Sequence, residues 1–444
     1  MSFDRESLGQ ALRKLAQLAG QPERLVIAYS GGLDSEVLLH ALAALRGSFG
    51  ADLLALHVDH GLQDESHAWS AHCASRANDL GVEFRALQVA VDKTSGQGVE
   101  AAAREARYAA FRAELQHGDW LLSAHHKDDQ AETLLLNLLR GSGPAGLAGI
   151  GEVQPFGPAW LVRPLLPFAR EELRHYAAAH DLEWIDDPSN EDRSFDRNYL
   201  RHEVFPVLQA RWPDASSRLR QSGVLAGEAA LLLDQLADSD LNSLGARADR
   251  LSVTGLLALD EERQRNVLRY TVRELGLPPV PASALQSIVT DLLPARADAQ
   301  PVVQWDGAEA RRYRGRVYLL SQADESSPVR TLPVDAGHAE LGPGLGLLRL
   351  EPGACRGLST AVVQAGLEVR RRKGGEQIKP LGQAHTKKLK KLLQEEGVVP
   401  WMRERVPLVY SSDTLVAVAD LWVADEAASS PGTAIRWEDR PALH

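Results

Sequence analysis

The sequence predicts an α/β protein with three parts: an N-terminal domain built on a parallel sheet, a helical middle domain and a small mixed α+β C-terminal domain. Over the first 125 residues, runs that are almost continuously apolar alternate with amphipathic stretches. Such runs are typical of parallel strands that are covered on both faces. The pattern is mostly helical from 216 to 325, and short strand-like runs return in the last hundred residues.

Four parallel strands are expected in the N-terminal domain, at 24–29, 51–59, 82–91 and 119–124. Amphipathic helices are expected between or after them, at 35–46, 65–80, 99–116 and 128–139. Helices of this length act as crossover connections between parallel strands. Ligands of such folds bind beyond the carboxyl ends of the strands, so the segments that follow the first and fourth strands should face one crevice.

We expect the three domains to span residues 1–215, 216–328 and 329–444. The second boundary lies in a polar stretch at 323–346 that is rich in proline and glycine. In the C-terminal domain we expect strands at GLLRL, LEVRRR, PLVY and TLVAVADLWV, and one basic helix at 386–396.

Composition favours a soluble, cytoplasmic enzyme. The 444 residues are 44% hydrophobic and 25% charged, and no apolar run is long enough to span a membrane. The first twenty residues contain acids and lack the apolar core of a signal peptide. The two cysteines, Cys73 and Cys355, are far apart in the sequence and form no CxxC pair, so we expect no iron–sulfur cluster.

The stretch SGGLDS at 30–35 follows the first predicted strand and opens a helix. Two glycines allow a tight turn with exposed backbone N–H groups, and the helix adds the positive end of its dipole. Together these groups favour an anion, most naturally a phosphate. The alternative is an ordinary turn in which Asp34 or Ser35 caps the helix. The Walker sequence of P-loop enzymes is absent.

The stretch AAAREARYAAF at 101–111 places Arg104, Arg107 and Tyr108 three and four residues apart on a predicted helix. Two guanidinium groups on one face suit a phosphate ligand. The alternative is a surface lattice of charge pairs, each of which contributes little to stability.

Polar side chains also follow the fourth strand, in SAHHKDDQAET at 123–133. Asp129 and Glu132 lie three apart on one helix face, where two carboxylates could hold an ammonium group. Acids that stabilise the helix dipole are the alternative, and this explains Asp128 well. We expect no zinc here, because the adjacent His125 and His126 are poorly spaced to bind one ion together.

Two other stretches carry groups that suit RNA. Arg197, Asn198 and Arg201 follow the turn DDPSN and could meet an RNA backbone. The net charge is −11, yet residues 370–391 hold nine Lys/Arg against one Glu. A solvated face is the alternative for such a run, but the asymmetry favours RNA. Its candidate contacts are Arg370, Arg371, Arg372, Lys387, Lys388, Lys390 and Lys391.

In this order, SGGLDS, AREARY, HHKDDQAET, RGSGPAGLAGI and DDPSNEDRSFDRN resemble the motifs of the tRNA(Ile)-lysidine synthetases, a family of PP-loop ATP pyrophosphatases. These motifs span residues 24–202, and the segment 369–410 resembles the C-terminal domain of that family. The middle region adds little to the resemblance. The resemblance implies a PP-loop, Rossmann-like catalytic domain and a ligase that forms a carbon–nitrogen bond.

The family's reaction is implied in the same way. ATP adenylates the C2 oxygen of the wobble cytidine in the CAU anticodon of tRNA(Ile), and pyrophosphate is released. L-lysine then attacks C2 and displaces AMP. The modified base changes codon recognition from AUG to AUA and charging from methionine to isoleucine.

Residue roles follow from the resemblance, position by position. ATP is expected to contact Ser30, Gly31, Gly32, Leu33, Asp34, Ser35, Arg104, Arg107 and His125. Asp34 is also expected to help hold Mg²⁺. The expected catalytic residues are Asp34, Arg104, Asp129 and Glu132, and the last two are expected to bind lysine. tRNA is expected to contact Arg197, Asn198, Arg201 and the basic residues of 370–391.

One residue needs a separate prediction, because Glu36 adds an acid directly after the loop. Its side chain is expected to point outward, where the helix dipole tolerates it. Two other functions stay open. A tRNA cytidine thiolase of the PP-loop superfamily is disfavoured by the lack of paired cysteines. A nucleotide-regulated RNA-binding protein without chemistry would leave the acidic pair and the arginines without a purpose.

Overall fold

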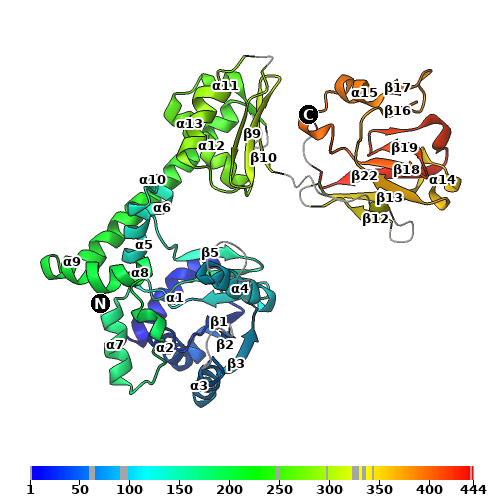
Figure 1. Ribbon diagram of the computed structural model, residues 1–444. Helices are drawn as coiled ribbons and strands as arrows, with labels where there is room; N and C mark the ends of the chain where they lie inside the picture. The colour runs from blue at the N-terminus through cyan, green and yellow to red at the C-terminus, as the bar shows by residue number, and fades with distance from the viewer. Residues whose placement is uncertain are drawn as a thin grey trace. The chain divides into compact units, whose positions relative to one another are not determined.

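The computed structural model describes residues 3–59, 66–90, 99–245, 250–296, 299–322, 330–332, 337–342, 345–440 and 443. The chain divides into two compact units, Met1–Leu232 and Leu233–His444 (Figure 1). The three predicted domain ranges stay a prediction, and most of the predicted boundary at 323–346 lies outside the described residues.

The first unit contains a six-stranded sheet in the order β3-β2-β1-β4-β6-β5. The four expected strands are present as β1 (Arg24–Ala28), β2 (Asp52–Asp59), β3 (Glu83–Gln88) and β4 (Trp120–Leu122). All of them run parallel to their neighbours, as predicted. The hairpin of β5 (Val153–Phe156) and β6 (Ala159–Val162) was not expected. It adds β6 in parallel beside β4 and leaves β5 as an antiparallel edge.

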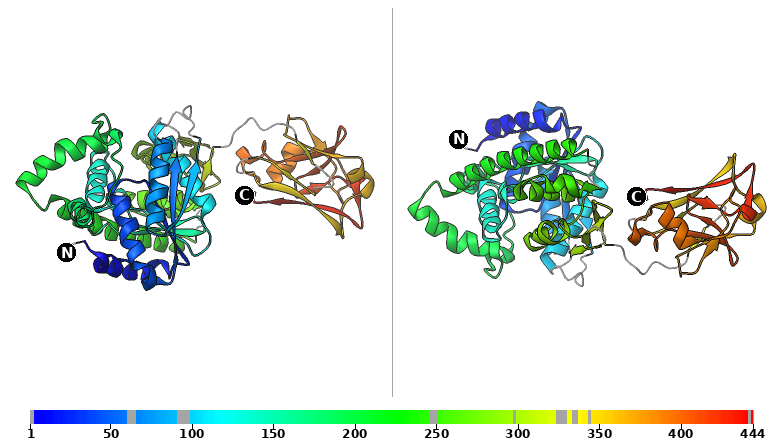
Figure 2. Two further views of the ribbon diagram at one scale, coloured as in Figure 1. Left: turned by 90° about the horizontal axis from the view of Figure 1, so that it is seen from below. Right: turned by 90° about the horizontal axis from the view of Figure 1, so that it is seen from above.

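Alternate side chains of β1 enter two separate cores. Leu25 and Ile27 pack into the core on the side of α1 (Arg5–Ala19) and α2 (Leu33–Phe49). Val26 faces the core that contains Phe111 of α4 (Val99–Glu114). Because both faces are covered, residues 25–28 form a continuous apolar run, and this is the signal that made the strand predictable. Figure 2 shows α1, in dark blue, on the outside of this unit.

The remaining expected helices of the first unit are α3 (Ser66–Asp79) and α5 (Lys127–Leu139). Beyond the sheet, α7 (Arg170–Ala179) is followed by short turns that were not predicted as helices. These are η1 (Pro188–Glu191), α8 (Asp196–Tyr199) and the π-helical η2 (Leu200–Val204), which continues into α9 (Phe205–Arg211). A 29-residue helix, α10 (Ala215–Ser243), then leads from the first unit into the second.

The helical prediction for the middle region is confirmed up to residue 292 but was wrong for its last part. The chain forms α11 (Val253–Leu257), α12 (Glu261–Glu274), α13 (Ala282–Ser287) and η3 (Ile288–Leu292), and strands before and after these helices make an antiparallel sheet in the order β7-β10-β9-β8. Its strands are β7 (Leu251–Ser252), β8 (Val302–Trp305), β9 (Ala308–Tyr313) and β10 (Arg316–Ser321). The inward residues of β9 are alanines, so the apolar alternation that marks a strand is weak there.

The C-terminal region is mixed α+β, as expected. It contains the sheets β11-β15-β18-β19-β20 and β12-β13-β22-β14-β21 and the pair β16–β17. Four expected runs appear as β13 (Leu347–Ala354), β15 (Leu367–Arg370), β18 (Leu408–Ser411) and β19 (Thr414–Val418), the last followed by β20 (Trp422–Val423). The other strands are β11 (Arg330–Leu332), β12 (His338–Glu340), β14 (Gly357–Leu358), β21 (Ala428–Ser429) and β22 (Gly432–Glu438).

Two short helices accompany these sheets, α14 (Thr360–Gln364) and α15 (Leu389–Glu395). The predicted basic helix therefore begins three residues later than expected. Lys387 and Lys388 instead form β17 (Lys387–Lys388), which pairs with β16 (Gln377–Ile378). Among the described residues, no helix is long and apolar enough to cross a membrane.

Candidate active site

A cavity of about 1120 Å³ opens at the carboxyl ends of the parallel strands. The turn after β1 and the segment after β4 both line it, as predicted from their places in the fold. The opposite wall comes from α4 and from residues between 185 and 201. The sequence motifs on both sides therefore meet in one crevice.

The turn after β1 depends on glycine at its tightest point. Gly31 has a φ of +82°, and a Cβ there would lie 2.7 Å from the Cys73 sulfur and 3.0 Å from Cδ1 of Ile185. Helix α2 begins at once after Gly32, so its unpaired N–H groups and positive dipole end face the cavity. Ser30 Oγ and Ser35 Oγ lie 3.0 Å apart and close the turn. This geometry suits an anion.

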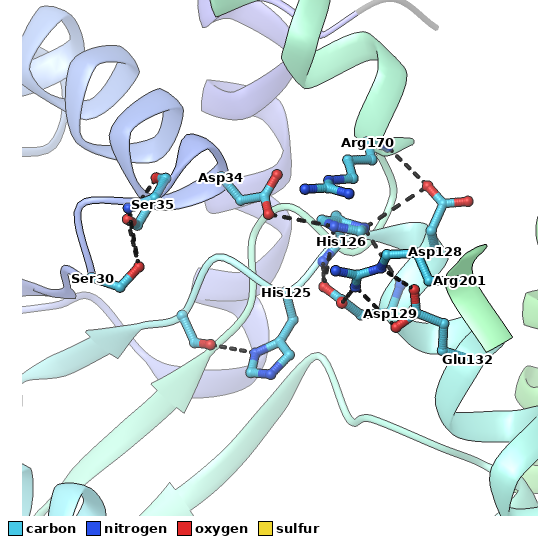
Figure 3. Close-up of polar contacts among 12 residues, drawn as sticks. Ser30, Asp34, Ser35, His125, His126, Asp128, Asp129, Glu132, Arg170 and Arg201 are labelled. Carbon is cyan, nitrogen blue, oxygen red and sulfur yellow. Dashed lines mark hydrogen bonds and ion pairs between the residues drawn. The ribbon is translucent and has the colours of Figure 1, made fainter. Parts of the chain in front are cut away.

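Asp34 stands at the first turn of α2 and contributes to the cavity wall. One of its carboxylate oxygens is buried and has no hydrogen-bond partner within the described part of the chain. The other lies 3.6 Å from Nε2 of His126 (Figure 3). A buried carboxylate oxygen with free lone pairs costs stability unless something binds it, and Mg²⁺ prefers such oxygen ligands. Asp34 therefore offers one ligand of the kind that the expected metal prefers.

His126 connects Asp34 to the acidic helix α5. It is the N-cap of α5, where its Nδ1 accepts a hydrogen bond from the Asp129 N–H. Its Nε2 lies 3.4 Å from the Asp129 carboxylate. Burial alone would lower the pKa of His126, but the carboxylates of Asp129 and Asp34 outweigh it and raise the pKa above its ordinary value. Sequence reasoning left the role of His126 open.

His125 behaves in the opposite way although it is the adjacent residue. Burial, together with the nearby guanidinium groups, lowers the pKa of His125 to about 4. Its Nδ1 forms a hydrogen bond with the hydroxyl group of Ser123, and the ring lines the cavity. His125 is therefore neutral at physiological pH and can accept or donate a hydrogen bond there without carrying charge.

The acidic pair on α5 is occupied by two arginines. Arg201 donates to Glu132 from Nε (2.8 Å) and Nη2 (3.0 Å) and to Asp129 from Nη2 (3.2 Å). Arg197 Nε donates to Glu132 at 2.9 Å. Only 1% of the Glu132 side chain is exposed, so its carboxylate depends on these partners. The negative charges of Asp129 and Glu132 are therefore balanced by the positive charges of Arg197 and Arg201.

These contacts bear on the expected RNA contacts in the segment after DDPSN. The guanidinium groups of Arg197 and Arg201 pair with carboxylates of α5, although 37% of the Arg197 side chain is exposed. The Asn198 amide donates to the backbone carbonyls of Ser189 and Asp192, which fixes the turn that carries the arginines. All three residues therefore have structural partners within the first unit.

A charged wall faces the glycine turn across the cavity. Arg104 and Arg107 project from α4 into the cavity lining and are solvent-exposed. Arg104 lies over the ring of Tyr108 at 4.9 Å and donates to its hydroxyl at 3.3 Å. This wall presents cations toward the loop, as a polyphosphate ligand needs.

Sequence reasoning missed two arginines in or near the cavity. Arg163 is 4% exposed, donates to the carbonyl of Gly151, and leaves its Nε without a partner among the described atoms. Arg170 opens α7 and lines the cavity close to Asp34 (Figure 3). The signal that could have found them is the run LVRPLLPFAR, which ends a buried strand and opens a helix.

The prediction for Glu36 was wrong. Its side chain is fully buried and does not point outward. Arg76 of α3 donates to it from Nε at 3.1 Å and from Nη2 at 3.0 Å, and the Tyr29 hydroxyl donates to its other oxygen. No sequence signal linked Arg76 to this position, because the two residues are 40 apart and lie on different helices.

The basic residues of the second unit fall into paired and unpaired groups. Arg370 contacts Glu368 and Asp413, Arg372 contacts Glu376, and Lys387 contacts Glu395. Lys388 and Lys390 are exposed and have no carboxylate partner among the described residues. Sequence reasoning also missed Arg314 and Arg316, which are exposed at the turn between β9 and β10.

The parallel sheet, the glycine turn after β1 and the cationic wall define an ATP-utilising enzyme of the PP-loop class, and residues 6–208 match the PP-loop domain family. The chain is 43% identical over 429 residues to the tRNA(Ile)-lysidine synthase of Alkalilimnicola ehrlichii, over 96% of this chain and 95% of that protein. The chain belongs to the tRNA(Ile)-lysidine synthase family.

A second relative and two further family models agree with this assignment. The tRNA(Ile)-lysidine synthase of Coxiella burnetii is 41% identical over 408 residues, over 90% of this chain and 89% of that protein. Residues 251–318 match the TilS substrate binding domain, and residues 367–438 match the TilS substrate C-terminal domain. Among solved structures, the U34-tRNA thiolase NcsA from Methanococcus maripaludis is similar with a TM-score of 0.40 and 16% identity, over 49% of this chain and 78% of that one.

Proposed function

We propose that this chain joins L-lysine to C2 of the wobble cytidine in the CAU anticodon of tRNA(Ile) and consumes ATP. The observation that carries the proposal is the crevice, in which an anion-binding turn, a partnerless carboxylate oxygen and an acid–arginine cluster face one another. The membership of the family supports the same reaction. We place the enzyme in the cytoplasm, where its tRNA substrate is found.

In the first step, the cytidine O2 attacks the α-phosphate of ATP and pyrophosphate leaves. We assign the polyphosphate to the backbone between Ser30 and Ser35 and to the guanidinium groups of Arg104 and Arg107, because these residues line the cavity. Asp34 would hold Mg²⁺, which supplies positive charge to the phosphates when it is bound. His125, neutral at physiological pH, would orient ATP by hydrogen bonding.

In the second step, the lysine ε-amine attacks C2, the C2–O bond breaks, and AMP leaves. We assign the lysine site to Asp129 and Glu132. Burial raises the pKa of Asp129, but the neighbouring His126, His125 and Arg197 outweigh it and hold that pKa below its ordinary value. Asp129 is therefore a weak proton acceptor, so its proposed role is to bind the lysine substrate and not to take its proton.

The tRNA is proposed to contact the second unit through its unpaired cations. Lys388 and Lys390 on β17 and α15, and Arg314 and Arg316 on the turn of β9 and β10, are exposed and free of carboxylate partners among the described residues. Arg370, Arg371, Arg372, Lys387 and Lys391 are proposed as secondary contacts. Phosphate contacts of this kind position the RNA without reading its sequence.

The test is a lysine-transfer assay. Purified protein, ATP and labelled lysine are incubated with a CAU-anticodon tRNA(Ile) transcript, and an initiator methionine tRNA with the same anticodon is the control. Incorporation into tRNA(Ile) alone, with one AMP released per lysine, is the expected result. Thiolation, or no reaction with either RNA, would contradict the proposal. A thiolase is disfavoured because Cys73 is buried under Gly31 and its thiol pKa is raised to about 12.

A further inference from the structure

Helix α3 contacts the turn at residues 30–35 and the start of α2 at two points. Cys73 packs against Gly31, where the turn has its positive φ. One helical turn further along, Arg76 forms an ion pair with Glu36, which lies in the first turn of α2. The Arg76 side chain is 21% exposed and that of Glu36 is 0% exposed. The ion pair is thus placed directly behind the residues that face the cavity.

The charge of Glu36 presents an electrostatic problem for the proposed ligand. It sits at the N-terminal end of α2, the same end that offers N–H groups to the polyphosphate. A buried carboxylate interacts strongly with another negative charge, because little water screens the two. Arg76 donates two hydrogen bonds to one oxygen of this carboxylate, and the Tyr29 hydroxyl donates to the other. The guanidinium group of Arg76 therefore neutralises the negative charge of the Glu36 carboxylate inside the protein.

We propose that Arg76 is a positioning residue for ATP, which neutralises Glu36 so that the turn at 30–35 binds polyphosphate without a negative charge behind it. This inference rests on the proposed binding of ATP at that turn. Arg76 does not line the cavity and acts only through Glu36. Removal of Arg76 alone should expose ATP to the carboxylate, and removal of both charges should relieve that repulsion.

The experiment compares Arg76→Met with the double variant Glu36→Gln/Arg76→Met. We expect the single change to raise the KM for ATP by about tenfold or more, since it leaves an unpaired buried charge. The double variant should return the KM for ATP to within about threefold of the unaltered enzyme, because no net charge then remains. The KM values for lysine and tRNA should change little in either variant.

Arg24→Met is the matched control. Arg24 pairs with the buried Asp119 at the opposite end of β1, and its side chain is 22% exposed, close to the 21% of Arg76. It should lower stability but leave the KM for ATP unchanged. A double variant that is as impaired as Arg76→Met, or worse, would overturn the proposal in favour of a packing role.

Glu36→Gln alone keeps the inference testable if Arg76→Met does not fold. That change leaves the arginine and removes the acid, so the KM for ATP should stay the same or fall. A rise of about tenfold would overturn the inference. ATP binding by the unaltered enzyme separates the two proposals: if it is absent, the proposed function fails, and if it is present but insensitive to these changes, only the role of Arg76 fails.

Discussion

Gly31 shows how a single residue sets the geometry of the turn at residues 30–35. Gly31→Ala would add a Cβ 2.7 Å from the Cys73 sulfur at a φ of +82°. We expect the turn to shift and the KM for ATP to rise by about tenfold or more, because the N–H groups lose their alignment. Steady-state kinetics measure this effect.

Gly50→Ala controls for backbone strain alone. Gly50 has a φ of +62° at the end of α2, and its added Cβ would meet no atom within 4 Å. It should cost about 1 kcal/mol of stability and leave ATP kinetics unchanged. Equal kinetic effects of the two alanines would contradict the role given to Gly31.

The two adjacent histidines should respond to pH with opposite sign. The unfolded state protonates His125 near its ordinary pKa, whereas the folded state does so only at about 4. Its contribution to the free energy of unfolding is therefore full above pH 6.5 and is lost as the pH falls from there to about 4. The pKa of His126 is raised, so its contribution is present at low pH and is lost as the pH rises through that pKa.

Urea denaturation at several pH values tests this contrast. His125→Asn should reduce the loss of stability on going from pH 7 to pH 5, and His126→Asn should increase it. The same change in both variants would rule out the assignment. The ordinary sequence pattern HH does not predict this difference, because it arises from the Ser123, Asp34 and Asp129 side chains around each ring.

At the scale of elements, Glu132 holds the short helical turns of residues 196–204 against α5. Glu132→Gln would leave the guanidinium groups of Arg197 and Arg201 with a neutral partner. We expect a loss of about 3 kcal/mol in stability, faster proteolysis near these turns and a KM for lysine at least about tenfold higher. Limited proteolysis and kinetics provide the two measurements.

The control is again in the first unit. Asp119→Asn breaks the buried pair with Arg24 far from the crevice. It should lower stability by a similar amount and leave the KM for lysine unchanged. If both variants raise that KM alike, Glu132 acts only through folding.

Helices, strands and turns could be predicted from the sequence where a local pattern, such as an apolar run or a pair of glycines, was strong. β1 and β2 contain continuous apolar runs, at 25–28 and 53–56, because both faces are covered, and the glycines of the turn mark where β1 ends. The hairpin β5–β6 and the strands β8–β10 were missed because they are short or carry charges along one face. The loop, His125 and Asp129 could be placed at one crevice from their positions after strands. The pairing of Glu132 with Arg201 could not, because 69 residues separate them.

At the scale of the whole molecule, tRNA affinity should depend on unpaired cations more than on total basic charge. Lys388→Ala/Lys390→Ala should weaken tRNA binding and reduce the dependence of log Kd on log salt by roughly 2 units of slope, as two phosphate contacts are lost. Filter binding over a range of potassium chloride concentrations measures this slope.

Arg370→Ala/Arg372→Ala removes the same number of charges, but Glu368, Asp413 and Glu376 already neutralise those arginines. Its effect on the slope should be smaller. A larger effect from the paired arginines would place the RNA on the other side of this segment and contradict the assignment of Lys388 and Lys390.

Because Glu132 is buried, its ion pairs with Arg197 and Arg201 should respond to salt differently from the exposed cations that are proposed to bind RNA. Dissolved ions screen charges that stand in water but hardly reach a carboxylate that is closed off from solvent. Potassium chloride should therefore weaken binding of the RNA backbone at concentrations well below those that disturb the ion pairs of Arg197 and Arg201 with Glu132. Turnover at saturating RNA would then tolerate far more electrolyte than capture of the RNA does.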